Sequence, residues 1–525
     1  MRSICISTKK ATYYNAEFKI KINYYQEEFF VQISWKEYCD KVYAAWIGKN
    51  IGGTFGAPYE GKREYFNVTD FETDAGAPLP NDDLDLQLIW LHAIERLGPR
   101  NVNAQTLGEM WISFMPAHWH EYGICKSNLR MGLPAPVSGD YKNNWKNSNG
   151  AWIRTEVWAC LAPAAPEVAA KYAIYDASVD HGTGEGTAAA AFVAAMESAA
   201  FLEKDLRKLI NIGLAAIPEN GRMADSIRHL LECYDSGMTA REARDSILAR
   251  NADIGTGWFE APSNVAYAVL GLLYGEGDFK KSMIAAVNCG DDTDCTGATV
   301  GAILGIMGGS SVLPEDWRAH IGDNIITMAV NIALLYYDYP RTCTELAERV
   351  IRQMPYMYAV HNYSIGTDEA GNKYICAEDG ASEDGGAWQT AVKQIAGEIS
   401  SRNPYTTEYQ VGPVKLLLRT KDAPDIKPGE SISVEVTLKN DYTSYGNITH
   451  GVQLSWKLPE GFSVEAEGGS RVFLPQFSAH DPDASAVYCA KIKAGETVSA
   501  VNRLVLVVEV EGRPTVGCVP LTLLG

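Results

Sequence analysis

The sequence predicts a multidomain protein, in which an all-α domain is followed by a C-terminal immunoglobulin-like β-sandwich. Two observations support this prediction. From residue 35 to about 355, apolar residues recur at helical spacing, and almost no segment shows the alternation of a strand. After Gly412 the period changes to two, in eight short segments separated by turns such as PGE and PEG. A chain of 525 residues has room for two or three domains.

We therefore divide the chain into four parts. Residues 1–34 are an N-terminal extension to which the sequence assigns no role. Residues 35–355 form the all-α domain, and residues 412–525 form the β-sandwich, whose length is typical of an immunoglobulin-like fold. Between them, residues 356–411 are rich in Tyr, Gly, Asp, Glu and Ser, and we interpret them as a connector with one helix near 388–399.

Charge and apolar patterning exclude some partners. The 46 basic and 65 acidic residues give a net charge of −19, which argues against binding to nucleic acid or to an anionic membrane. A membrane span needs about eighteen or more consecutive apolar residues. The apolar run after Asp294 is too short and too rich in glycine, so we expect no membrane span.

Cysteine usage favours a cytoplasmic location. The 11 cysteines are odd in number and scattered without a Cys-x-x-Cys pair, which argues against a zinc cage or a dense disulfide framework. Residues 1–34 contain no long apolar segment typical of a secretory signal. A secreted or periplasmic location is the alternative if the translation start is misassigned. The sequence does not define the oligomeric state.

The first predicted helix leads into a glycine-rich segment. Its apolar residues recur at steps of three and four: Trp35, Tyr38, Val42, Ala45 and Trp46. The segment at 48–61, GKNIGGTFGAPYEG, follows, and its glycines and Pro58 predict a tight loop that carries Glu60. Taken alone, Glu60 is an ordinary exposed loop acid.

Two further helices are predicted to begin with acidic residues. In 80–98, Asn81 is a candidate N-cap, and Asp82 and Asp83 fall in the first turn. In 288–309, NCGDDTDCTGATVGAILGIMGG, three aspartates precede a buried apolar helix: Asp291, Asp292 and Asp294. Three neighbouring acids repel one another and are costly to desolvate, so a bound cation would explain them. A solvated acidic cap is the alternative.

Glycine-rich turns separate the middle helices. SNGAWIR contains Asn149 and Gly150 and leads into a helix, and DHGTGEG at 180–186 precedes an alanine-rich helix at 187–202. His181 is a candidate catalytic or substrate-binding group, or a hydrogen-bonded loop histidine. The HWH triplet at 118–120 lacks the i, i+4 spacing of a zinc helix, which favours packing or substrate contact.

Three of these segments together resemble the ADP-ribosylglycohydrolase (DraG/ARH-like) family, in the order expected for that family. GGTFGAPYEG resembles its first loop, which ends in Pro-x-Glu. PNDDLDLQL resembles its Thr-Asp-Asp-Thr helix start, and NCGDDTDCTGATVGAILG resembles its Gly-Gly-Asp-Thr-Asp-Thr segment. SNGAWIR and VDHGTGEG match two intervening loops less closely. The resemblance covers about residues 35–355, and the ordered set is more specific than any single motif.

The resemblance implies an all-α hydrolase with two Mg²⁺ ions, and the β-sandwich that follows it is interpreted as an accessory domain. The residues implied as metal ligands are Asn81, Asp82, Asp83, Asp292, Asp294 and Cys295. Glu60 and Asp292 are the implied catalytic residues. Asn149, Gly150 and His181 match loops that contact the nucleotide or ribose. Carboxylate oxygens are ligands that Mg²⁺ prefers, and paired ions can hold vicinal hydroxyls and polarise a water molecule.

This chain departs from the family pattern at four positions. Asn81 and Leu84 replace the two threonines of the first acidic motif, and Asp291 replaces a glycine of the second. Cys295 stands where a threonine hydroxyl normally helps to bind metal. A thiol is a soft ligand poorly suited to Mg²⁺.

The resemblance implies a glycosyl hydrolase that removes ADP-ribose from a modified protein or from a ribosyl-containing small molecule. Nearby carboxylates would support the positive charge that develops at the anomeric carbon. A furanosidase acting on a glycan or nucleoside is the first alternative, favoured by the altered motif and the appended sandwich. A non-catalytic member of the fold is the second, favoured by Cys295.

Overall fold

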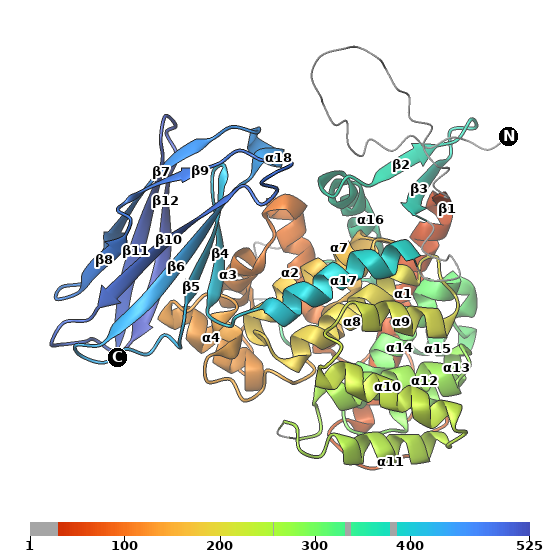
Figure 1. The fold of residues 1–525 in the computed structure, drawn as a ribbon. Coiled ribbons are helices and arrows are strands. Elements are labelled where there is room, and N and C mark those ends of the chain that lie inside the picture. Colours follow the sequence, from red (N-terminus) through yellow and green to blue (C-terminus); the bar gives the residue numbers. More distant parts are fainter. Residues whose placement is uncertain (1–29, 256, 331–337, 379–385) are drawn as a thin grey trace. The chain divides into compact units, whose positions relative to one another are not determined.

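The computed structural model describes four stretches of the chain, which are residues 30–255, 257–330, 338–378 and 386–525 (Figure 1). They divide into two compact units. The first contains the chain up to Glu121 together with Asn144–Ser401, and the second contains Tyr122–Asn143 together with Arg402–Gly525. The predicted extension at 1–34 lies almost wholly outside the described residues.

The first unit is helical apart from one small sheet. Its longer helices are α1 (Trp35–Gly56), α2 (Asp82–Leu97), α3 (Ala104–Phe114), α7 (Pro166–Asp180), α8 (Glu185–Ala199), α9 (Leu206–Ala215), α10 (Arg222–Asp235), α11 (Ala240–Arg250), α12 (Ala261–Tyr274), α13 (Phe279–Val287), α14 (Thr293–Gly308), α16 (Cys343–Val360) and α17 (Gly386–Ser401). Its short ones are η1 (Ala57–Tyr59), η2 (Pro99–Asn101), η3 (Trp152–Arg154), α6 (Glu156–Leu161), η4 (Gly309–Val312) and α15 (Glu315–Ile321). The helix α4 (His120–Met131) crosses from the first unit into the second. These elements confirm the predicted all-α domain.

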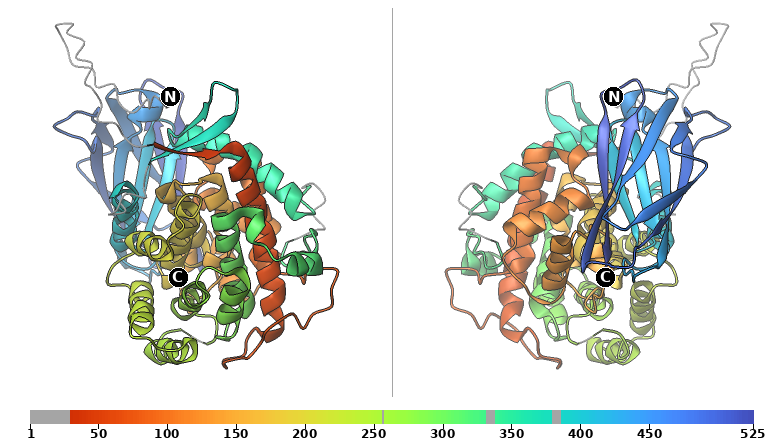
Figure 2. Two further views of the ribbon diagram at one scale, coloured as in Figure 1. Left: turned by 90° about the vertical axis from the view of Figure 1, so that its right-hand side faces the viewer. Right: turned by 90° about the vertical axis from the view of Figure 1, so that its left-hand side faces the viewer.

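The helices α1 and α14 lie side by side (Figure 2), and glycines form the contact on both of them. Glycines recur every fourth residue on both helices, so each helix presents one glycine face: Gly48, Gly52 and Gly56 on α1, and Gly297, Gly301 and Gly305 on α14. A Cβ atom at Gly52 would overlap the carbonyl of Gly297, and one at Gly48 would overlap the carbonyl of Gly301. Small residues at such spacing allow two helix backbones to approach closely.

The prediction of a loop at 48–61 is therefore wrong for most of this segment. The helix α1 continues to Gly56, and only the turn from Ala57 onward leaves it. Glycine usually weakens a helix, but here the contact with α14 requires it. The short η1 follows, with Pro58 in its first turn, and Glu60 comes directly after it.

The stretch Thr293–Val312, which joins α14 to η4, is long and apolar enough by composition to cross a membrane. From the sequence, this apolar run is judged too short to span a membrane, and its length is therefore underestimated. Most of the stretch is buried inside the domain, and the core helix of a folded domain passes the same test.

The segment predicted as a connector belongs in large part to the first unit, which extends to Ser401. The strands β1 (Phe30–Ser34), β2 (Ser364–Thr367) and β3 (Lys373–Glu378) form an antiparallel sheet in the order β1-β3-β2. Sequence reasoning missed these short strands. The helix predicted near 388–399 is α17.

The second unit contains the predicted all-β domain. Its nine strands are β4 (Thr406–Val411), β5 (Val414–Thr420), β6 (Ser431–Asn440), β7 (His450–Lys457), β8 (Ser463–Glu467), β9 (Arg471–Leu474), β10 (Ser485–Lys493), β11 (Val501–Val510) and β12 (Val516–Leu524). They form two sheets, ordered β4-β5-β6-β10-β8 and β12-β11-β7-β9. Alternate residues of β6 and β11 enter one apolar core, as expected of a sandwich. Eight of the strands match predicted segments, and β4 was missed. The unit also includes two short helices, α5 (Val137–Asp140) and α18 (Tyr442–Tyr445).

The glycine contact predicts a position-specific loss of stability. We expect Gly52→Ala to lower the free energy of unfolding of the first unit by about 1–3 kcal/mol or more, because overpacking forces the backbones apart. Gly397→Ala is the matched control, since Gly397 is exposed on α17 and has free space around it. That change should stabilise the helix by about 0.5–1 kcal/mol. Calorimetric unfolding measures both, and equal effects would contradict the packing argument.

Candidate metal centre and active site

Three segments of the first unit bring acidic side chains together. Glu60 comes from the turn after η1, Asp83 from the start of α2, and Asp294 from the first turn of α14. Two local bonds position these segments. The Asn81 side chain accepts a hydrogen bond of 2.7 Å from the Asp83 backbone N–H, which confirms Asn81 as the N-cap of α2. The Thr293 hydroxyl donates to the Gly56 carbonyl at 2.8 Å, which ties the end of α1 to the start of α14.

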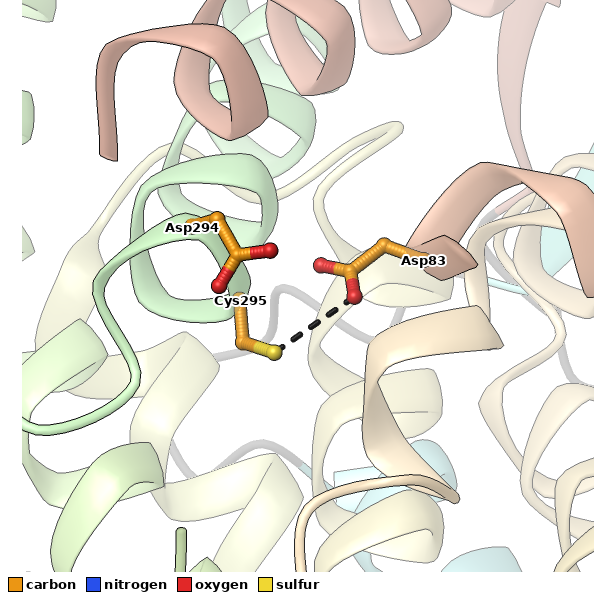
Figure 3. Close-up of side chains that lie close together, drawn as sticks. All are labelled: Asp83, Asp294 and Cys295. Atoms are coloured by element: carbon orange, nitrogen blue, oxygen red, sulfur yellow. Dashed lines mark hydrogen bonds between the residues drawn. The ribbon is translucent and has the colours of Figure 1, made fainter. Parts of the chain in front are cut away.

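The side chains form two triads that share Asp294. One contains Asp83, Asp294 and Cys295, and the other contains Glu60, Asp292 and Asp294. Within each triad the candidate ligand atoms lie within 4.8 Å of one another. Figure 3 shows the first triad, in which the Cys295 thiol donates to Asp83 Oδ1 at 3.4 Å.

Burial and mutual repulsion together raise the pKa values of three carboxyl groups in the triads. The carboxylate of Asp294, followed by burial and the charge of Asp82, raises the pKa of Glu60 to about 8. Burial and the nearby Asp294 raise the pKa of Asp83 well above its ordinary value, and the same two causes act on Asp292. Buried carboxylates this close together cannot all ionise unless positive charge lies among them.

The residues present fit a divalent cation. Asp83 is fully buried and Asp294 is 7% exposed. Among the described residues, neither Asp83 Oδ2 nor Asp294 Oδ1 has a hydrogen-bond partner. Buried carboxylate oxygens are normally paired, so these two atoms are free to serve as ligands. Asp82 lies near the triads, close enough to raise the pKa of Glu60.

Two asparagines hold Asp292 in place. The Asn149 amide donates to Asp292 Oδ2 at 2.6 Å, and the Asn264 side chain accepts from the Asp292 backbone N–H at 3.1 Å. Asn149 is fixed in turn by Trp152, whose indole N–H donates to its Oδ1 at 2.8 Å. The structure thus places Asn149, predicted to bind substrate, directly on a predicted metal ligand. Its contact with a substrate stays a prediction.

A buried ion pair lies behind Asp83. Lys49 Nζ contacts Glu156 Oε1 at 2.8 Å and donates to the Ile153 carbonyl at 2.7 Å. Gln87, a residue of α2, links this ion pair to Asp83. Its amide donates to Glu156 Oε2 at 2.7 Å and to the backbone carbonyl of Asp83 at 3.0 Å. The positive charge of Lys49 opposes the rise in the pKa of Asp83. None of these three side chains was identified from the sequence.

The extra acid of the motif, Asp291, is neutralised by Arg63. The guanidinium donates from Nε and Nη2 to the two carboxylate oxygens, each at 3.0 Å. Asp291 has φ 62°, which favours glycine and which aspartate tolerates better than most residues. An antiparallel backbone bridge joins Asp291 to Lys62, and this bridge holds the segment that carries Glu60 beside the start of α14.

His181 is fully buried and belongs to a polar network. Its Nδ1 lies 3.0 Å from Asp180 Oδ1, and its Nε2 lies 3.0 Å from the Ser148 hydroxyl. Arg154 binds Asp180 through both terminal nitrogens and also donates to the Gly150 carbonyl. The network therefore supports the loop that presents Asn149. The predicted binding of substrate by His181 and Gly150 stays a prediction.

Aromatic rings flank the Glu60 turn. The rings of Trp145 and Phe259 stack at 4.9 Å, and the His120 ring lies 4.6 Å from Trp145. Trp258 contacts Phe259 at 4.7 Å and lies beside Gly61, where an added Cβ would be 3.7 Å from its indole. Trp145 and Trp258 are half-buried, so part of this aromatic cluster is accessible to a ligand ring.

The acidic triads form a candidate metal centre within the helical first unit. The sequence profile of the ADP-ribosylglycohydrolase family matches residues 34–354, which is more than half of the chain, and the chain belongs to that family. Family members typically bind metal ions. A search of curated proteins found no match.

Three solved structures match parts of the chain at low sequence identity. One described as an ADP-ribosylglycohydrolase-related protein complex is 20% identical, with a TM-score of 0.41, and the match covers 62% of this chain and 99% of that chain. A FixG-related protein from Vibrio parahaemolyticus is 9% identical, with a TM-score of 0.17, and covers 22% of this chain and 97% of its own. The GAE domain of GGA2p from Saccharomyces cerevisiae is 10% identical, with a TM-score of 0.15, and the match covers 23% of this chain and 96% of that domain.

The network at His181 predicts a pH-dependent stability difference. Burial raises the pKa of Glu121 to about 7, opposed by His181 and reinforced by Asp180. The folded protein thus holds a proton that the unfolded chain loses near pH 4.5, so Glu121 lowers stability progressively as pH rises from about 4.5 to 7. We expect the free energy of unfolding of Glu121→Gln to equal that of the wild type near pH 4. Above pH 7 it should be larger than that of the wild type by up to about 3 kcal/mol. Urea unfolding across this range measures the difference, and a constant gap would contradict the assignment.

Proposed function

We propose that the protein is a metal-dependent hydrolase of a ribosyl glycosidic bond, and that it removes ADP-ribose from a modified protein or small molecule. The observation that carries this proposal is the pair of triads that share Asp294. One shared carboxylate between two sets of donors is the arrangement that two neighbouring cations need. Family membership supports the hydrolase class.

Asp83, Asp294 and Cys295 would hold one ion, and Glu60, Asp292 and Asp294 the other. Bound Mg²⁺ would supply a hard positive charge that grips vicinal ribose hydroxyls and polarises a water molecule. Asn149 keeps one oxygen of Asp292 hydrogen-bonded and so orients the carboxylate.

Glu60 is the exposed member of the triads, and we assign to it proton exchange with the attacking water. The aromatic cluster beside Gly61 offers a stacking surface for the planar base of an ADP-ribosyl group. A furanosidase would use the same triads with a sugar ring against these aromatics, and it is the second candidate.

Metal binding predicts opposite effects of one substitution. Asp294→Asn removes the carboxylate that belongs to both triads, so in chelator we expect this variant to unfold at a higher temperature than the wild type. With excess divalent ion the order should reverse, because the wild type gains about 2.7 kcal/mol at a concentration of 100 Kd and the variant gains little. Thermal unfolding with and without Mg²⁺ tests this. A variant stabilised as much as the wild type would exclude Asp294 as a ligand.

Isothermal titration of ADP-ribose tests the substrate class. We expect binding to wild type only in the presence of Mg²⁺, and its loss in Asp292→Ala/Asp294→Ala. Release of ADP-ribose from N- and O-linked substrates would then establish the activity. Metal binding without affinity for ADP-ribose, together with cleavage of a furanoside, would establish the second candidate. Metal binding without any cleavage would indicate a non-catalytic protein.

A further inference from the structure

The two triads differ in their donor atoms. Glu60, Asp292 and Asp294 offer oxygen alone, whereas Asp83, Asp294 and Cys295 offer two carboxylates and a sulfur. They also differ in exposure, since Glu60 is exposed whereas Cys295 is 5% exposed and Asp83 is fully buried. The triad that contains Glu60 therefore offers hard oxygen ligands and is open to water. The triad that contains Cys295 includes a softer sulfur ligand and is buried.

The Cys295 thiol is directed into its triad. Its Sγ donates to Asp83 Oδ1 at 3.4 Å, and Figure 3 shows the sulfur pointing toward Asp83 while the Asp294 carboxylate lies beside it. Among the described residues, Asp83 Oδ2 and Asp294 Oδ1 are buried without a hydrogen-bond partner. These two observations point to a cation held by both carboxylates and the sulfur.

Thiolate and Mg²⁺ are a poor match. Magnesium requires oxygen ligands in near-ideal octahedral geometry, whereas thiolates select zinc and related transition ions. We propose that the triad of Asp83, Asp294 and Cys295 binds a first-row transition dication of the Zn²⁺ and Co²⁺ class, while the all-oxygen triad keeps Mg²⁺. This inference rests on the proposed function only in taking both triads as parts of one metal centre.

Binding involves one proton and no redox change. The S–H bond of Cys295 breaks, both of its electrons stay on sulfur, and the proton passes to solvent as the sulfur–metal bond forms. Asp83 is held from behind through Gln87, which binds its backbone carbonyl.

Cobalt titration of the metal-stripped full chain tests the proposal. We expect a near-ultraviolet thiolate-to-cobalt charge-transfer band in the wild type. Cys295→Ser and Cys295→Thr should lose that band and weaken Co²⁺ binding by roughly tenfold or more. Cys518→Ser is the control for adventitious binding, because Cys518 is an exposed thiol of the second unit, and it should keep the band.

Metal analysis after dialysis against equimolar Zn²⁺ and Mg²⁺ gives an independent readout. The wild type should retain both metals, and Cys295→Thr should shift toward Mg²⁺ alone while unfolding at a similar temperature. An unchanged band and metal ratio in both Cys295 variants would overturn the inference and leave the proposed hydrolase intact. A Cys295-dependent band in a protein that releases no ADP-ribose would instead defeat the proposed substrate.

Discussion

The direct contact between the α1 and α14 backbones is the constraint on which the rest of the first unit depends. The contact uses glycines at four-residue spacing on both helices, and each bare Cα lies against a carbonyl of the other helix. Since α1 ends at Gly56, bonded through its carbonyl to Thr293, the chain that leaves α1 emerges beside the acidic start of α14. Glu60 thereby reaches Asp292 and Asp294 from a segment more than 200 residues away in the sequence.

Some buried charges around this junction have a partner of opposite charge, whereas within the described residues the carboxylates of the two triads do not. The buried charges of Lys49 and Glu156 pair at 2.8 Å, and Asp291 has its own guanidinium from Arg63. The carboxylates of the two triads face one another instead. Repulsion by Asp294 raises the pKa of Glu60, and burial together with that repulsion raises the pKa values of Asp83 and Asp292. A cation among these carboxylates would supply the positive charge that they need in order to ionise together.

The sequence predicted the acidic parts of the site better than the rest, because helix starts have local signatures. Asn81 as N-cap and acids in the first turns of α2 and α14 follow from capping rules, and the alternating pattern yielded eight strands of the sandwich. The glycines of α1 were misread as a loop, since a glycine required by a neighbouring helix looks the same in sequence as one required by a turn. Lys49, Gln87 and Glu156 come together only in three dimensions, and no local pattern marks them.

Asp291 and Cys295, two departures from the family motif, have opposite consequences. Asp291 occupies a backbone conformation that favours glycine, but its carboxylate is bound by Arg63, so the added charge is neutralised outside both triads. Cys295 replaces an oxygen donor with sulfur, and its thiol contacts Asp83 directly. A substitution alters the chemistry of a centre when its side chain enters the group of ligands. By that criterion Asp291 changes how the loop is held, whereas Cys295 adds a sulfur atom to the candidate ligands of the Asp83 triad.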